Sequence, residues 1–291
     1  MIAPRRSSRP SSNVPGRRDR GRQDLRRSRG GDHPDQDRRE HEQEGLSSFG
    51  PSPFYLFIHL STIMRPDEVM RRLNELADLS RLNGMARYGI PVDRALGVAL
   101  PQIRSLAKEI GRDHALAAAL WATKVHEARM LATLVDEPDM VSESQMNAMV
   151  DEFASWDICD QCCNNLFRLT PIAWKKALEW SDLQEEFQKR AGFALMAALA
   201  VHDRRAKDDD FLTFLEAVER HSVDGRNYVK KALNWALRQI GKRNLVLNQK
   251  AVEAAERIMV KGDKASRWVA SDALRELKSD AVRERLNNRE K

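Results

Sequence analysis

The sequence predicts an all-α protein built from stacked helix pairs. From residue 67 onward, apolar residues recur at intervals of three and four, as in Val69, Leu73 and Leu76, which places them on one face of a helix. Glycine and proline breakers separate these segments, whereas the two-residue alternation of half-buried strands is not found. Successive helix pairs span about 35–45 residues, which is the period of stacked-helix solenoids.

Residues 1–63 precede these helices and are expected to form a disordered tail. Residues 1–50 hold twelve arginines, no lysine, eight acidic residues and few large aliphatics, so they cannot bury enough apolar surface to offset the entropy of ordering. The tail is either an arm for polyanions or the product of an over-extended start. The second hypothesis has the protein begin at Met64, because Pro66 suits the first turn of a helix and lysine usage becomes normal from there.

The remaining residues, 64–291, are predicted to form one helical domain of the HEAT-like α-solenoid type. Such an α-α superhelix would offer a concave face for a partner. Ten to thirteen helices of ordinary length are expected in it.

Charge and composition exclude several classes of protein. The net charge is +6, but +4 of it lies in residues 1–50, so the domain is not globally basic and any nucleic-acid surface must come from local placement of charge. The longest apolar stretch, residues 191–201, is far shorter than the roughly 20 residues of a membrane-spanning helix. Three cysteines within five positions exclude a disulfide scaffold and indicate a cytoplasmic location.

The segment 229–243 is predicted to be a helix with a basic face. It contains five basic residues and no acidic residue, although a solvated helix face usually mixes both signs. Its apolar stripe is Val229, Leu233, Ala236 and Ile240, and the opposite face carries Lys231, Trp235, Arg238 and Lys242. A tryptophan among cations fits a nucleic-acid backbone with a sugar or base against the indole. Alternatively, Trp235 packs on a neighbouring helix and the cations are merely solvated.

A second helix places an aromatic residue and a carboxylate one turn apart. Trp156 and Asp160 share a face that points away from the apolar stripe of that helix, so they form a candidate site, although surface Trp–Asp pairs also occur by chance. Asp157 near the helix start is interpreted as a charge that favours the helix dipole.

The remaining residues whose side chains could bind a metal or catalyse a reaction are expected to have structural roles. Cys159, Cys162 and Cys163 have no histidine nearby in the sequence to complete a zinc site, so core packing is favoured, and no metal or cofactor is expected. The acidic run 208–210 is interpreted as charge at a helix N-terminus.

These segments together resemble the AlkD-like DNA alkylation repair family, the HEAT-like glycosylases that excise cationic alkylpurines. Segment 229–242 is the most specific match. Weaker matches, in the same order along the chain, are residues 85–90, 101–108, 156–160 and 189–191. The resemblance covers about residues 85–275. Phe187 stands where the family often has tryptophan, and Lys189 where it often has arginine, which leaves the alignment of Arg190 less secure.

The resemblance implies a role for each site residue. Asp160 would be the catalytic carboxylate, Trp156 and Trp235 the aromatic walls around the deoxyribose, and Arg190 a phosphate contact beside the lesion. Lys231, Arg238 and Lys242 are predicted to bind the DNA backbone.

The resemblance also implies the reaction. A cationic alkylpurine leaves without protonation, so a fixed carboxylate need only stabilise the sugar oxocarbenium and position water. The expected protein is a monomeric, monofunctional DNA glycosylase of base excision repair that acts on duplex DNA. The alternative is a noncatalytic HEAT-like scaffold that binds DNA or a protein. Asp160→Asn separates the two, because only the glycosylase requires the charge.

Overall fold

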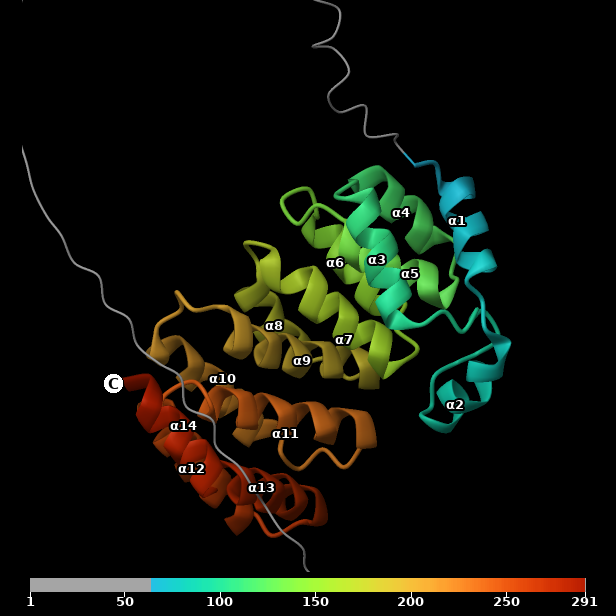
Figure 1. Ribbon diagram of the computed structural model, residues 1–291. Coiled ribbons are helices and arrows are strands. Elements are labelled where there is room, and N and C mark those ends of the chain that lie inside the picture. The colour runs from blue at the N-terminus through green and yellow to red at the C-terminus, as the bar shows by residue number, and fades with distance from the viewer. Residues whose placement is uncertain (1–63, 291) are drawn as a thin grey trace, which may run out of the picture. The chain divides into compact units, whose positions relative to one another are not determined.

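A computed structural model describes residues 64–290, and the predicted tail over 1–63 lies outside the described residues. Within that range the prediction of an all-helical fold is confirmed, with fourteen α-helices, two short 3₁₀ turns and no strand (Figure 1). The number exceeds the expected thirteen at most, because α2 has only six residues and α14 is highly polar. Neither presents the long apolar periodicity by which helices are recognised in a sequence.

The first seven helices are α1 (Pro66–Glu75), α2 (Leu82–Arg87), α3 (Leu100–Ile110), α4 (His114–Ala122), α5 (His126–Val135), α6 (Glu143–Asp151) and α7 (Trp156–Asn165). The remaining seven are α8 (Ala173–Ser181), α9 (Glu186–His202), α10 (Asp208–His221), α11 (Asn227–Gly241), α12 (Leu245–Val260), α13 (Lys264–Leu277) and α14 (Asp280–Glu290). The 3₁₀ turns cover Leu79–Arg81 and Phe167–Leu169.

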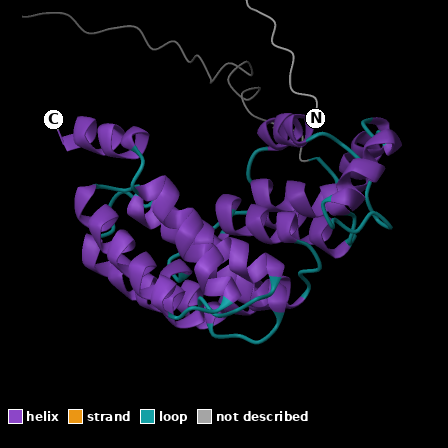
Figure 2. Cartoon of the chain, turned by 90° about the horizontal axis from the view of Figure 1, so that it is seen from below, coloured by secondary structure: helices purple, strands orange, loops and turns teal. Residues whose placement is uncertain are grey.

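The helices of the described range stack in two rows. In one row α3, α5, α7, α9, α11 and α13 each contact the next, and in the other α8 contacts α10 and α10 contacts α12. The rows are joined by contacts such as those of α8 with α9 and α12 with α13. Figure 2 shows that the helices follow a curve rather than a straight line. This is the two-layered superhelix that the spacing of the helix pairs predicts.

Local signals in the sequence set several helix starts. Pro66 is the first residue of α1, with Asp67 and Glu68 in the first turn, where a missing N–H costs nothing and negative charge is favourable. The side chains of Asp113 and Asp263 accept hydrogen bonds from the first backbone N–H groups of α4 and α13. Such caps are each worth about 1 kcal/mol.

Helix α9 lies at the centre of the stack and is buried on nearly all sides. Residues 191–200 are all buried, which explains why this apolar stretch lacks a polar face. Gly192 allows the close approach of α8, since a Cβ there would clash with the backbone of Ala177 and Ser181. Because it is buried in this way, helix α9 holds its neighbours α7 and α11 in fixed positions.

No helix within residues 64–290 is both long and apolar enough to cross a membrane.

Candidate active site

The N-terminal turn of α7 carries the predicted pair Trp156 and Asp160 on one side and Asp157 on the other. Asp157 is buried, accepts a 2.6 Å hydrogen bond from the Ser155 hydroxyl and lies 2.9 Å from Nε2 of His126. Burial alone would raise the pKa of Asp157, but the hydrogen bonds from His126 and Ser155 outweigh it and lower that pKa. Asp157 is therefore engaged in fixing the start of α7, in line with its structural interpretation.

Asp160 and Arg190 form a bidentate ion pair between α7 and α9. Arg190 Nη2 lies 2.7 Å from Asp160 Oδ2, and Nε lies 3.0 Å from Oδ1. The side chains are only 16% and 7% exposed for Asp160 and Arg190, respectively. Burial raises the pKa of Asp160, and the adjacent guanidinium opposes part of that rise. The pair therefore fixes the orientation of the carboxylate, and the guanidinium limits the rise in its pKa.

Arg190 also connects this carboxylate to the other side chains of the site. Its Nη1 donates a 2.7 Å hydrogen bond to the carbonyl oxygen of Tyr228 on α11. Its guanidinium carbon lies 6.0 Å from the ring centroid of Trp156. One side chain thus contacts α7 and α11 from α9, so the three helices share a single polar cluster.

A cavity of about 530 Å³ opens beside this cluster. Trp156, Arg190 and Lys231 line it, together with Tyr228, Asn227 and residues 86–89. The indole Nε1 of Trp156 donates a 2.9 Å hydrogen bond to the carbonyl oxygen of Tyr88. The cavity wall is therefore partly aromatic and partly cationic, whereas neither Asp160 nor Trp235 is among the lining residues.

The segment that follows α2 closes one side of the cavity through a glycine. Gly89 has a φ of +74°, and a Cβ there would clash with the hydroxyl of Tyr228. A side chain at this position would thus suffer both backbone strain and a collision. Tyr228 packs in turn on Phe187, with ring centroids 5.2 Å apart. Phe187, the departure from the family pattern, supports the cavity wall from behind.

The basic face of α11 divides into two parts. Lys231 is exposed, lines the cavity and forms no ion pair with any residue in the described range. Arg238 and Lys242 both pair with Glu276 of α13, with Lys242 Nζ 2.6 Å from Oε1. Burial would raise the pKa of Glu276, but these two cations lower it. The acid lacking in α11 is thus supplied by the next helix of the row.

Trp235 lies one helical turn beyond Lys231 on the same face of α11. It is half-buried and packs against the hydrophobic core. The structure therefore brings together Trp156, Asp160, Arg190 and Lys231, and it places Trp235, Arg238 and Lys242 farther along α11.

Sequence analysis missed several residues around this site. Tyr228 and Gly89 stand beside or within segments already noted for their resemblance, but no local signal shows that they meet. Glu276 is 34 positions from Lys242, and only the stacking of α13 on α11 reveals the pairing.

The cysteines and the acidic run behave as structural elements. Cys159, Cys162 and Cys163 are free and fully buried, and burial raises the pKa of all three thiols, which confirms core packing. Asp208 and its neighbours form the first turn of α10. No group of three or more metal-ligating side chains occurs among the residues that the structure describes.

Comparisons with known proteins identify the family and the fold of this chain. A sequence model for the family described as "DNA alkylation repair enzyme" matches residues 69–277. A solved structure described as "a new family of proteins related to the HEAT-like repeat DNA glycosylases with affinity for branched DNA structures" has a TM-score of 0.66 and 23% identity. The match covers 77% of this chain and 96% of that one, and it confirms the HEAT-like fold. Among curated proteins, no sequence matches this chain.

Proposed function

Since this chain belongs to the DNA alkylation repair enzyme family, we propose that it is a monofunctional DNA glycosylase for cationic N3- and N7-alkylpurines. The observation that carries the proposal is the ion pair of Asp160 with Arg190, held beside Trp156 at the edge of a cavity. A half-buried carboxylate of fixed orientation is what an oxocarbenium-like transition state requires.

In this proposal Asp160 acts on the sugar and not on the base. The alkylated purine already carries a positive charge and departs as a neutral base, so no general acid is needed. Positive charge then develops on the deoxyribose, where a fixed carboxylate stabilises the transition state more than the ground state. Arg190 occupies one lone pair on each carboxylate oxygen, and the remaining lone pairs face the sugar or hold the attacking water.

Trp156 and Trp235 supply the aromatic contacts in this proposal. An indole face over a developing sugar cation contributes about 0.5–2 kcal/mol. Trp156 is fixed for this by its hydrogen bond to Tyr88. Trp235 contacts the DNA where the duplex passes along α11 beyond Lys231.

The cations divide the contacts to the DNA backbone. Lys231 is exposed at the cavity and binds the phosphate nearest the lesion, together with the N–H groups of Arg190 that remain unused. Arg238 and Lys242 bind phosphates farther away and share Glu276 while they do so. A monomer on duplex DNA accounts for all of these roles, and three free cysteines support a cytoplasmic location.

A noncatalytic DNA-binding scaffold is the second candidate. It is favoured by the solved structure named above, which is described by its affinity for branched DNA, and by the ion pair itself, since both oxygens of Asp160 already have a partner. The two candidates share the cations of α11 and differ in whether Asp160 acts on a sugar.

The test is the release of N7-methylguanine or N3-methyladenine from duplex DNA by the wild-type protein. The glycosylase predicts release of the free base that leaves an abasic site without strand cleavage. Duplex binding without release would instead establish the scaffold.

A further inference from the structure

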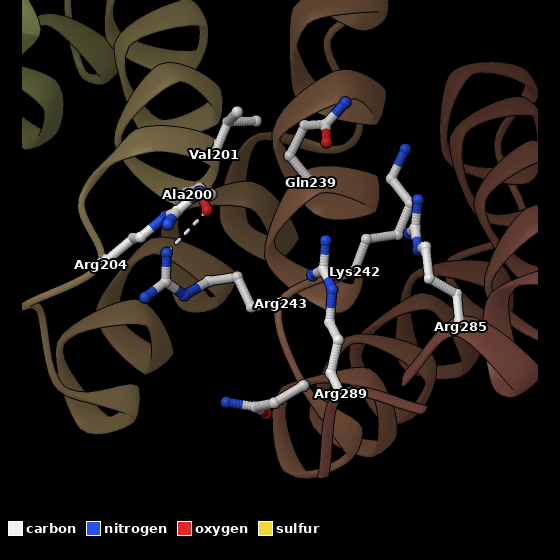
Figure 3. A pocket seen from close by; sticks show the side chains of 9 residues that line it. Ala200, Val201, Arg204, Gln239, Lys242, Arg243, Arg285 and Arg289 are labelled. Atoms are coloured by element: carbon white, nitrogen blue, oxygen red, sulfur yellow. Dashed lines mark hydrogen bonds between the residues drawn. The ribbon is translucent and has the colours of Figure 1, made fainter. Parts of the chain in front are cut away.

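A second hollow lies at the opposite end of α11 from the candidate active site. It has a volume of about 580 Å³ and forms where α9 and α11 end, and two residues of α14 complete its lining. Figure 3 shows several long basic side chains around it. The lining residues are Ala200, Val201, Arg204, Gln239, Lys242, Arg243, Asn244, Arg285 and Arg289.

The side chains that line this hollow are predominantly basic. Five of its nine lining residues are cations and none is acidic. Lys242 is paired with Glu276, whereas the four arginines form no ion pair with any described residue. Arg285 and Arg289 stand one turn apart on α14, and like charges at that spacing destabilise a helix. A bound anion would remove this repulsion.

Two of the arginines have a structural role that explains their position. Arg243 Nη1 donates a 2.7 Å hydrogen bond to the carbonyl oxygen of Ala200, and its guanidinium lies 4.1 Å from the ring centroid of Phe211. Arg289 donates to the carbonyl oxygen of Lys242 at 3.3 Å. Both therefore satisfy carbonyls at helix C-termini, which attract positive charge.

Arg204 and Arg285 have no such explanation. Both are exposed, and neither side chain forms a hydrogen bond with any described residue. They come from different elements, the connection after α9 and helix α14, and converge on the same hollow. The hollow thus offers several N–H donors with no acceptor from the described chain.

We propose that this hollow binds phosphodiester groups of the DNA backbone, as an anchor separate from the active site. Lys231 and Lys242 mark the two ends of the basic face of α11. Their eleven-residue separation corresponds to about 16 Å along the helix, or about five nucleotide steps of one DNA strand. The volume of about 580 Å³ suits a length of backbone better than a single inorganic anion. The inference rests on the proposed function only in taking DNA as the ligand.

The test compares two double variants that remove the same charge. Arg204→Ala with Arg285→Ala removes the two arginines that lack a structural contact. Arg205→Ala with Arg283→Ala is the matched control, because these arginines are exposed on the same two elements but do not line the hollow. Binding to an undamaged duplex is measured by fluorescence anisotropy over a range of salt concentrations.

The hollow variant is expected to bind the duplex about tenfold more weakly than the control variant. The slope of log affinity against log salt should fall by about 2, since two phosphate contacts are lost. Arg204→Lys with Arg285→Lys should restore most of that slope, because the charges remain. Equal affinities and slopes for hollow and control variants, with melting temperatures like wild type, would overturn the inference.

Two further measurements distinguish this DNA-backbone anchor from a small-anion site and from the proposed glycosylase activity. Calorimetric titration with inorganic phosphate tests for a small-anion site. The inference would also be overturned if the wild type bound phosphate, the hollow variant did not, and the slope of log duplex affinity against log salt were the same for both proteins. Base release by saturating protein should be the same for hollow variant and wild type. Failure of the wild type to release base would refute the proposed glycosylase, while the salt slopes would still decide the anchor.

Discussion

Asp160→Asn is the substitution that tests the proposed chemistry most directly. Asparagine has the same shape, so its amide oxygen can still accept from one N–H of Arg190, while its NH₂ group faces a second N–H donor. One hydrogen bond to a charged group is lost, which costs about 1.5–3 kcal/mol, and the low exposure of both side chains leaves little solvent to compensate. For a domain of this size each kcal/mol shifts the melting temperature by about 2–4 °C, so it should fall by about 3–12 °C.

The effect on base release should be larger than the effect on folding. A sugar cation about 3 Å from the carboxylate and about 6 Å from the guanidinium gains about 5.5 and loses about 2.8 kcal/mol at an effective dielectric constant of about 20. Asp160→Asn removes the attraction of about 5.5 kcal/mol and leaves the repulsion from Arg190, which corresponds to a rate factor of about 10⁴, whereas loss of one well-placed electrostatic partner typically costs 10²–10³. Release by Asp160→Asn should therefore be slower than wild-type release by about a hundredfold or more.

The assay is single-turnover release of N7-methylguanine at a temperature where every variant is folded. Asp157→Asn is the control, because it makes the same substitution in the same helix at a buried carboxylate that pairs with His126. The control should lose stability but keep its release rate, while Asp160→Asn should bind duplex as tightly as wild type or tighter. Wild-type release by Asp160→Asn, or an equal loss in both variants, would refute the assignment.

Three other substitutions test the cavity and its charges. Lys231→Ala should weaken duplex binding and reduce the salt slope by about 1, and an unchanged slope would remove this lysine from the interface. Arg190→Gln removes the guanidinium that opposes the burial-driven rise in the pKa of Asp160. Asp160 should then take up its proton at higher pH, so the acid side of the release profile should move to higher pH; an unmoved profile would mean that another group limits the rate. Gly89→Ala should slow release, because its Cβ meets the Tyr228 hydroxyl, and Tyr228→Phe in the same chain should recover part of the rate. Wild-type release by Gly89→Ala alone would show that the cavity does not need this segment.

The helical fold could be predicted because its signals are local. Apolar periodicity marks each long helix, and proline or acidic residues mark starts such as that of α1. The pair of Trp156 and Asp160 could be predicted from the sequence for the same reason, since two residues one turn apart share a face wherever the helix lies. Resemblance then added Arg190, and the structure places it against Asp160.

The charge balance of α11 could not be predicted in this way. The helix itself contains no acid, so its basic face reads as free to bind phosphate. Glu276 nevertheless pairs with Arg238 and Lys242 from α13. A solvated face balances its charge over all helices that meet there, and sequence periodicity describes only one of them. The same limit hid the meeting of Gly89 with Tyr228.

These pairings change the roles that the predicted residues have in the proposed mechanism. The sequence predicts Arg190 as a phosphate contact, yet three of its five N–H groups are directed at Asp160 and at the Tyr228 carbonyl. Its main effect in the proposed mechanism is therefore to orient the carboxylate and to limit the rise in its pKa. The phosphate beside the lesion then falls chiefly to Lys231, which is exposed and unpaired within the described range. Because the proposed mechanism has Lys231 and Asp160 act on different groups of the substrate, DNA affinity and base release should be separable by mutation, and a scaffold without chemistry would show only DNA affinity.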